Sequence, residues 1–228
     1  MGDGPARAYP ERMTARLPLF PLGTVLFPGL VLPLHVFEER YRCLVRDLLA
    51  APEEEQRFGV VAIREGREVG SEGVHALHPV GCVARLRRVD PYDDGRFDIL
   101  STGDRRFRLD EVDTSLPYLR GDVEMLDEQA GDSAIPLGSL VASAFETYRH
   151  ALGATSDADL PEDPRALSYL VAATVVLDLT DKQRLLEAPD TTDRLRRELR
   201  LLRRETALLG LLPSLPGVEL TRIPASPN

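Results

Sequence analysis

Residues 17–41, LPLFPLGTVLFPGLVLPLHVFEERY, decide the fold. Within them, the apolar runs 17–20 and 30–36 are separated by glycines and prolines, a punctuation typical of strands. After the second run, apolar residues recur at helical spacing, at Phe37, Tyr41, Leu44, Val45 and Leu48. The stretch therefore predicts two strands joined by a turn and then a helix from about Phe37 to Ala50, which Pro52 ends.

The strand punctuation continues from this stretch to about Leu126, so the first half of the chain is expected to be mainly β. Further strands are predicted at residues 58–63, 81–89, 96–102, 105–112 and 118–125. Asp94-Gly95 lies between two of these runs. It predicts a hairpin with a type I′ turn, because that turn needs positive φ and glycine adopts it without steric cost.

The apolar period changes from 2 to 3.6 beyond residues 127–133, so the second half is expected to be helical. Helices are predicted at 137–152, at 164–177 with Asp163 as the N-cap, at 180–186 with Thr180 as the N-cap, and from Thr191 or Thr192 to Gly210. The expected fold class is α+β, divided into a flexible N-terminus 1–16, a β-rich subdomain 17–126, a helical bundle 127–210 and a proline-rich tail 211–228.

Composition excludes several classes of function. Net charge is −9, which opposes nucleic-acid binding because lysine and arginine supply most of the affinity for phosphate. No apolar run reaches the length of about 18–20 residues that a membrane span needs. Residues 1–16 lack the apolar stretch of a secretory signal. We therefore expect a cytoplasmic protein without membrane or nucleic-acid partners.

Two further features of the sequence, a group of possible metal ligands and a helix rich in arginine, are interpreted without a bound metal or partner. His75, His78 and Cys82 are close in sequence, but zinc sites normally need four ligands and no Cys-x-x-Cys accompanies them, so no metal or cofactor is expected. His35 is expected to be a hydrogen-bonded structural residue. The last helix carries six arginines against three acidic residues between 193 and 205, and we interpret them as a solvated face. An acidic partner is the alternative for that face.

Residues 17–41 resemble the opening of the Lon protease N-terminal domain family, in which a P-L-F-P-L strand, a P-G turn and an L-P-L-x-x-F-E-x-R-Y strand-to-helix entry occur in this order. The similarity extends through 58–61, 80–84, 103–108, Tyr118, Asp163-Pro164, 183–187 and 192–195. It covers about Leu17 to Leu209, and a stand-alone bacterial member of the family is expected.

The resemblance implies a β-rich, PUA-like pseudobarrel followed by a helical bundle, and a domain that helps to capture unfolded or damaged polypeptides. It therefore implies a noncatalytic polypeptide-binding or adaptor protein, with a protease system as a further candidate partner. RNA binding is suggested by the PUA-like fold alone, and the net charge opposes it. The client and the oligomeric state are not fixed by the sequence.

The predicted polypeptide-binding surface comprises Phe27, Pro28, Phe37 and Tyr92. These residues lie at turns and element ends of the β-rich half, where a fold has less reason to bury them. The alternative from another class is an enzyme or small-ligand binder that uses a pocket between the subdomains. Convergent ionisable residues in such a pocket would favour that alternative.

Lys182 is the only lysine, and it is expected to lie exposed in a helical first turn with no glycine-rich loop before it. A phosphate-binding P-loop needs a lysine after glycines, and a Ser–Lys dyad needs a lysine of lowered pKa. We predict no turnover when the purified protein is incubated with ATP or unfolded casein. Turnover that disappears in Lys182→Ala would refute this prediction.

Overall fold

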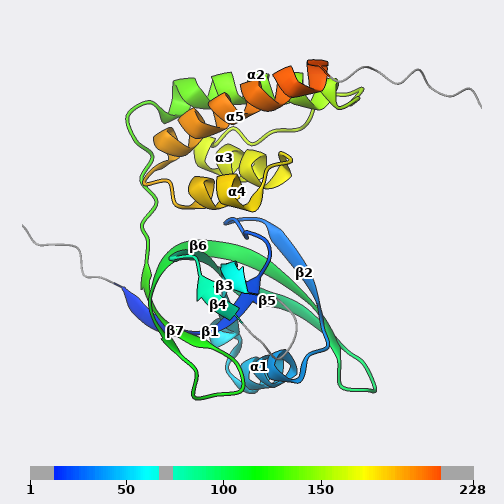
Figure 1. Cartoon of the computed structure of the whole chain (residues 1–228), viewed down its shortest axis with the longest axis vertical. Helices are drawn as coiled ribbons and strands as arrows, with labels where there is room; N and C mark the ends of the chain where they lie inside the picture. The colour runs from blue at the N-terminus through cyan, green and yellow to red at the C-terminus, as the bar shows by residue number, and fades with distance from the viewer. Residues whose placement is uncertain (1–12, 67–73, 212–228) are drawn as a thin grey trace, which may run out of the picture.

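The computed structural model describes residues 13–66 and 74–211. Most of the expected N-terminal segment 1–16, nearly all of the tail 211–228 and the side chain of His75 lie outside the described residues. Within the described ranges, a ring of strands forms one half of the molecule and four helices form the other (Figure 1). The α+β fold class expected from the sequence is confirmed.

The β-rich half contains β1 (Thr14–Leu22), β2 (Val31–Val36), β3 (Arg57–Gly66), β4 (Val74–Leu77), β5 (Val80–Pro91), β6 (Phe97–Asp113) and β7 (Arg120–Met125). The order is β1-β7-β6-β5-β3-β4, and a parallel pairing of β1 with β3 closes the ring. All the other pairings are antiparallel. Among the described strands, β2 pairs with β6 alone and is therefore an edge strand.

Phe107 fills the ring because glycines leave room for its side chain. A Cβ atom at Gly81 would lie 2.5 Å from the Phe107 ring and 2.5 Å from the Val60 carbonyl oxygen. A Cβ atom at Gly59 would lie 2.8 Å from the same ring. Both glycines, on the neighbouring strands β3 and β5, let the backbone approach one buried aromatic side chain closely.

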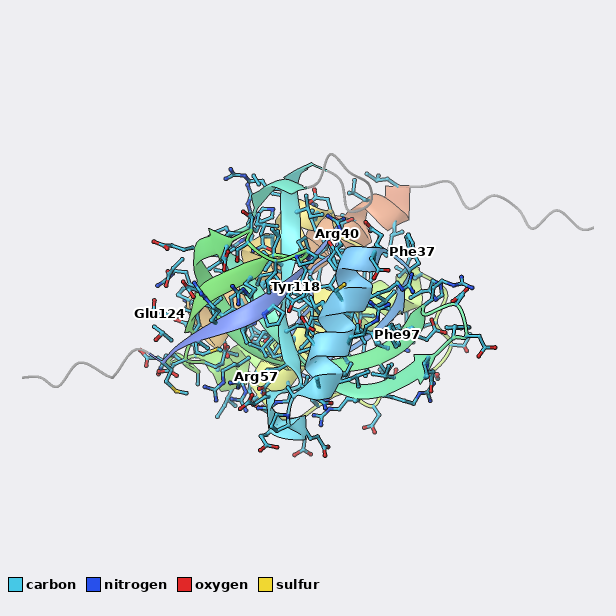
Figure 2. All side chains as sticks on the ribbon, turned by 90° about the horizontal axis from the view of Figure 1, so that it is seen from below. Phe37, Arg40, Arg57, Phe97, Tyr118 and Glu124 are labelled. Carbon is cyan, nitrogen blue, oxygen red and sulfur yellow. The ribbon has the colours of Figure 1, made fainter. Side chains whose placement is uncertain are left out.

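Helix α1 (Glu39–Ala50) packs across the ring, as Figure 2 shows from below. Its buried residues are Tyr41, Leu44, Val45 and Leu48, the apolar phase predicted from the sequence. Tyr41 stacks on Phe20 with 4.1 Å between ring centroids. A short 3-10 helix, η1 (Glu53–Glu55), follows after Pro52.

The helical half contains α2 (Ala134–Ala151), α3 (Pro164–Thr174), α4 (Leu179–Leu186) and α5 (Thr191–Leu211). In Figure 1, α2 and α5 form the outer layer, and α3 and α4 lie between them and the ring. The Asp163 carboxylate accepts a hydrogen bond from the Arg165 amide, which confirms the predicted N-cap. Asp178, rather than Thr180, is the N-cap of α4. No helix in the described ranges is long and apolar enough to cross a membrane.

Two glycines have roles other than those predicted. The strands expected at 96–102 and 105–112 form one continuous strand, β6. Gly103, which lies between them, continues the strand instead of ending it. A glycine is needed there because a Cβ atom would lie 2.3 Å from the Phe27 carbonyl oxygen. The expected type I′ turn is wrong. Gly95 has a φ of +81° but no described non-glycine residue has positive φ, so residues 93–95 form a three-residue loop with glycine in the left-handed position.

Two neighbouring leucines on α1 test the packing. Leu48 is 4% exposed and Leu49 is 45% exposed. Leu48→Ala should lower the free energy of unfolding by about 2–5 kcal/mol, because it leaves a cavity in the core. Leu49→Ala should change it by less than about 0.5 kcal/mol. Urea denaturation measures both values, and equal effects would show that the helix is rotated from its described orientation.

Candidate functional site

Phe37 and Tyr92, two of the predicted binding residues, lie together on the surface of the β-rich half. The side chain of His35 lies between them: its ring is 6.2 Å from Phe37 in a stacked arrangement and 5.8 Å from Tyr92 in an edge arrangement. All three residues are exposed, Phe37 at 49% and Tyr92 at 43%. We call His35, Phe37 and Tyr92 the aromatic patch.

Local chain geometry produces this exposure. Glu38 is the N-cap of α1 and has an extended backbone, so the helix begins at Glu39 rather than at Phe37 as predicted. Phe37 consequently lies outside the buried helical phase, beside the first turn of α1 (Figure 2). Along β2, alternate residues point outward, and the exposed ones are Val31, Pro33 and His35.

Hydrogen bonds hold the aromatic patch in place. His35 Nδ1 donates to the Asp98 carboxylate at 2.6 Å, and the Tyr92 hydroxyl donates to the other oxygen of Asp98 at 2.5 Å. Hydrogen bonds from Tyr92 and His35 lower the pKa of Asp98. The same tyrosine bond raises the pKa of Tyr92. His35 is therefore the hydrogen-bonded histidine that the sequence predicted, and its ring is oriented rather than free to rotate.

Arginines tie the hairpin loop to its surroundings. Arg42 of α1 donates from Nε to the Gly95 carbonyl oxygen at 2.7 Å and from NH2 to the Asp94 carbonyl oxygen at 3.1 Å. The Arg96 guanidinium lies 5.4 Å from the centroid of the Tyr92 ring, within the range of a cation–π contact. Because α1 also follows directly from Phe37, one helix fixes both sides of the aromatic patch.

The prediction that Phe27 is exposed at a turn is wrong. Phe27 is 1% exposed and packs 6.2 Å from the Tyr169 ring, where the ring of strands meets α3 and α4. Its side chain is part of the core that joins the two halves, because the close approach of Gly103 to the Phe27 backbone draws this turn inward. Pro28 lines a separate pocket, whose lining includes neither Phe37 nor Tyr92.

That pocket lies between the two halves and has a volume of about 440 Å³. Its charged lining residues are Asp104, Arg105, Arg106, Asp127, Glu128, Asp163 and Arg165. Ionisable groups therefore converge here, as the ligand-binding alternative requires. Among the described residues that line the pocket, none is a serine, threonine, cysteine, histidine or lysine, so its acid–base groups are the carboxylates and Tyr169.

A charge cluster centred on the partly buried Glu128 forms part of the wall of this pocket. Glu128 accepts hydrogen bonds from Tyr169 at 2.6 Å and from Thr191 at 2.9 Å, and it forms ion pairs with Arg106, at 2.8 Å, and Arg194. Burial acts to raise the pKa of Glu128, but Arg194, Tyr169 and Arg106 outweigh it, so the pKa lies below its ordinary value. One carboxylate thus joins β6, α3 and α5.

Both arginines of the cluster make further bonds that link the halves. Arg106 Nη1 donates to the carbonyl oxygens of Leu186 at 2.7 Å and Ala188 at 2.6 Å, at the carboxyl end of α4. Arg194 donates from Nε to Ser168 at 2.8 Å, and its guanidinium lies 3.9 Å from the Tyr169 ring centroid. The prediction that Arg194 lies on a solvated face is wrong, because Arg194 is fully buried.

Lys182 is not exposed as expected. It is half-buried, its Nζ donates to the Ala173 carbonyl oxygen at 3.1 Å, and burial lowers its pKa. Ala173 belongs to the last turn of α3, whose carbonyl groups lack helical partners. The lysine therefore caps a neighbouring helix. The buried Cys82 thiol, whose pKa burial raises, packs in the core of the ring.

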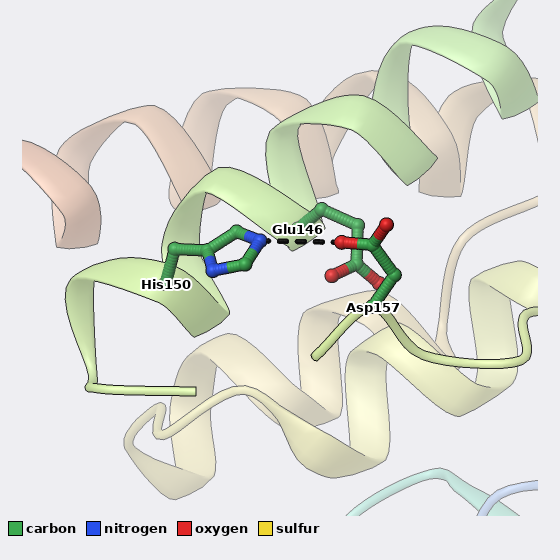
Figure 3. Close-up of side chains that lie close together, drawn as sticks. All are labelled: Glu146, His150 and Asp157. Carbon is green, nitrogen blue, oxygen red and sulfur yellow. Dashed lines mark hydrogen bonds and ion pairs between the residues drawn. The ribbon is translucent and has the colours of Figure 1, made fainter. Parts of the chain in front are cut away.

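One group of side chains in the helical half, shown in Figure 3, has the composition of a cation site. The ligand atoms of Glu146, His150 and Asp157 lie within 4.8 Å of one another. Both carboxylate oxygens of Glu146 are, however, within 3.0 Å of the Arg149 guanidinium, and Asp157 is 85% exposed. Glu146 also accepts from the Ala158 amide at 3.0 Å. These contacts fasten the loop after α2 to the helix.

The substrate-binding domain model of the ATP-dependent protease La (LON) family matches residues 16–204, so this chain belongs to the Lon substrate-binding domain family. It is 29% identical over 210 residues to the Lon protease of Anaeromyxobacter dehalogenans and 31% identical over 222 residues to Lon protease 2 of Sorangium cellulosum. These matches cover 88% and 91% of this chain but 24% and 27% of the proteases. The chain thus spans about a quarter of the length of these curated relatives.

Solved structures support the same assignment. The Lon N-terminal domain protein from Xanthomonas campestris superposes with a TM-score of 0.62 at 27% identity, covering 82% of this chain and 98% of that one. The N-terminal domain of the Mycobacterium avium complex Lon protease superposes with a TM-score of 0.63 at 21% identity, covering 85% of this chain and 98% of that one, which shows the shared fold. The family resemblance of residues 17–41 is confirmed.

The charge cluster makes a pH-dependent prediction. Glu128→Gln should lower the free energy of unfolding at pH 7 by about 3–5 kcal/mol, because two buried guanidinium groups lose their carboxylate. Since the folded pKa of Glu128 is lowered, its stabilisation is present above the unfolded value of about 4.3 and is lost as pH falls through the folded pKa. The difference between wild type and variant should therefore shrink in acid.

Urea denaturation at several pH values measures this difference. Glu54→Gln, on the exposed η1, is the matched control and should change stability by less than about 0.5 kcal/mol at any pH. A Glu128→Gln protein as stable as wild type at pH 7 would show that the buried cluster does not join the halves.

Proposed function

We propose that this protein binds unfolded or damaged polypeptides without catalysis, as an adaptor in protein quality control, and that the aromatic patch is where they bind. The observation that carries the proposal is the exposure of Phe37 and Tyr92 on either side of His35. Aromatic side chains exposed together commonly mark a protein-binding surface, because they supply large contact area with few rotatable bonds.

The edge strand β2 extends this surface. Val31, Pro33 and His35 form an exposed row that leads to Phe37, and Val31 is 59% exposed. An extended polypeptide lying along β2 would place apolar side chains on this row, which is the geometry of recognition at a sheet edge. Pairing with β6 holds β2 in an extended conformation, so the surface is formed before a client binds.

Membership of the Lon substrate-binding family supports the same proposal, since the family model is named for substrate binding. By this proposal the protein is cytoplasmic, its clients are unfolded polypeptides, and a protease system receives them. The charge of −9 supports the absence of nucleic-acid partners. The exposed apolar surface of the aromatic patch suits the binding of clients. The net negative charge of the chain makes copies of the protein repel one another and so favours solubility.

The pocket between the halves favours a second candidate function, small-ligand binding. Its ionisable lining residues are already engaged in part, because Arg106 pairs with Glu128, Asp104 pairs with Arg85 at 2.9 Å, and Asp163 accepts from the Arg165 amide. The pocket also includes Pro28, the remaining predicted binding residue. A ligand that raises the melting temperature, with the rise removed by Asp127→Asn, would establish this function.

The main proposal is tested by titrating fluorescently labelled, permanently unfolded casein. Phe37→Ala and Tyr92→Ala should each weaken binding about tenfold, which corresponds to about 1.4 kcal/mol. Melting temperatures should change little because both side chains are exposed. Raising the salt concentration should weaken binding only slightly, because apolar contacts are not screened.

Val176→Ala is the matched control, since Val176 is 74% exposed but lies between α3 and α4 in the helical half. It should bind like wild type. If Phe37→Ala and Tyr92→Ala bind casein as tightly as the control does, the aromatic patch is not the client site.

A further inference from the structure

A second hollow surface lies between α4 and α5, outside the aromatic patch and the pocket between the halves. It has a volume of about 490 Å³ and is lined by Arg184, Arg197, Arg200, Arg204, Asp181, Asp193, Leu185 and Leu201. We call it the basic groove. Figure 1 shows α5 at the end of the molecule opposite α1 and the β5–β6 hairpin, so the two surfaces do not overlap.

The basic groove carries excess positive charge on an acidic chain. Its two aspartates are both paired, Asp181 with Arg204 at 2.9 Å and Asp193 with Arg197 at 2.6 Å. Arg184 is 67% exposed and only 3.6 Å from the Asp181 carboxylate that Arg204 already holds. Arg200 is exposed and forms no ion pair with a carboxylate of the residues that the structure describes. Since the whole chain is −9, the positive charge is a local property of this groove.

The arginines are arranged by the helices rather than scattered. Arg197, Arg200 and Arg204 follow one another at spacings of three and four, so they project from one side of α5. Arg197 Nη1 donates to the Arg184 carbonyl oxygen at 2.8 Å, which fixes the distance between the two helices. Of the six arginines on α5, Arg194 is buried in the charge cluster and these three line the groove. The arginines of α5 therefore do not form a single, uniformly solvated face.

We propose that the basic groove binds an acidic segment of a partner polypeptide. Guanidinium groups bind carboxylates with paired hydrogen bonds, and Arg184 and Arg200 provide the groups least occupied by internal partners. The groove includes Leu185 and Leu201, which suit the apolar side chains interspersed in an acidic polypeptide. A nucleic acid fits less well, because Asp181 and Asp193 would face its continuous row of phosphates.

The experiment uses a fluorescent twelve-residue peptide of alternating glutamate and leucine pairs, titrated into the full chain at low and high salt. It should bind at low salt and weaken as ionic strength rises, because the charges at the groove are exposed. Arg184→Glu/Arg200→Glu should weaken binding at least about tenfold. Arg87→Glu/Arg88→Glu makes the same change in charge at exposed arginines outside the groove and should change binding less than about twofold.

The outcomes separate this proposal from the client site. Binding of unfolded casein should be unchanged in Arg184→Glu/Arg200→Glu, so failure of one surface is visible without failure of the other. If the charge reversal lowers the melting temperature, Arg184→Gln/Arg200→Gln takes its place. The proposal is overturned if the peptide does not bind at low salt, if both double variants weaken it equally, or if a single-stranded twelve-nucleotide oligomer binds the groove more tightly.

Discussion

The arrangement of the whole molecule depends on one partly buried carboxylate. Glu128 lies between the guanidinium groups of Arg106, from the ring of strands, and Arg194, from the last helix. Other groups help to stabilise the two buried cations and the one anion: Tyr169 and Thr191 donate to Glu128, and the carboxyl end of α4 accepts from Arg106. The negative end of the α4 dipole helps to offset the second cation. This cluster requires one orientation of the helices over the ring.

Because the helices have one orientation over the ring, the aromatic patch and the basic groove have a fixed position relative to each other. The aromatic patch is built on β2, the β5–β6 hairpin and the start of α1, and the basic groove is built on α4 and α5. Neither surface needs a mobile segment to form, because Asp98 orients His35 and Tyr92, and Arg197 spaces the helices. A preformed surface loses less conformational entropy on binding. An apolar client and an acidic partner could thus be held at opposite ends of one rigid body.

The sequence predicted the structural features that depend on the local spacing of residues. The apolar phase of α1, the change from strands to helices near residue 127 and the Asp163 cap all follow from local spacing. Position in three dimensions was not predictable in the same way. Phe27 stands beside Pro28 and Gly29 like a turn residue, but a close backbone approach at Gly103 buries it. Arg194 is one arginine among six on its helix, and only its meeting with Glu128, 66 residues away in sequence, distinguishes it. Two of the predicted site residues, Phe37 and Tyr92, lie on either side of His35, for which the sequence predicts a structural role only.

The account's central claim is that polypeptides are held on the aromatic patch of the β-rich half. Amide hydrogen exchange of the full chain, with and without a saturating unfolded polypeptide, tests it most directly because every described segment is observed at once. The account predicts new protection in residues 31–37 and in the hairpin loop 92–96, with α2 and α3 unchanged. Protection confined to the pocket between the halves or to α4 and α5, with none in 31–37 or 92–96, would contradict it.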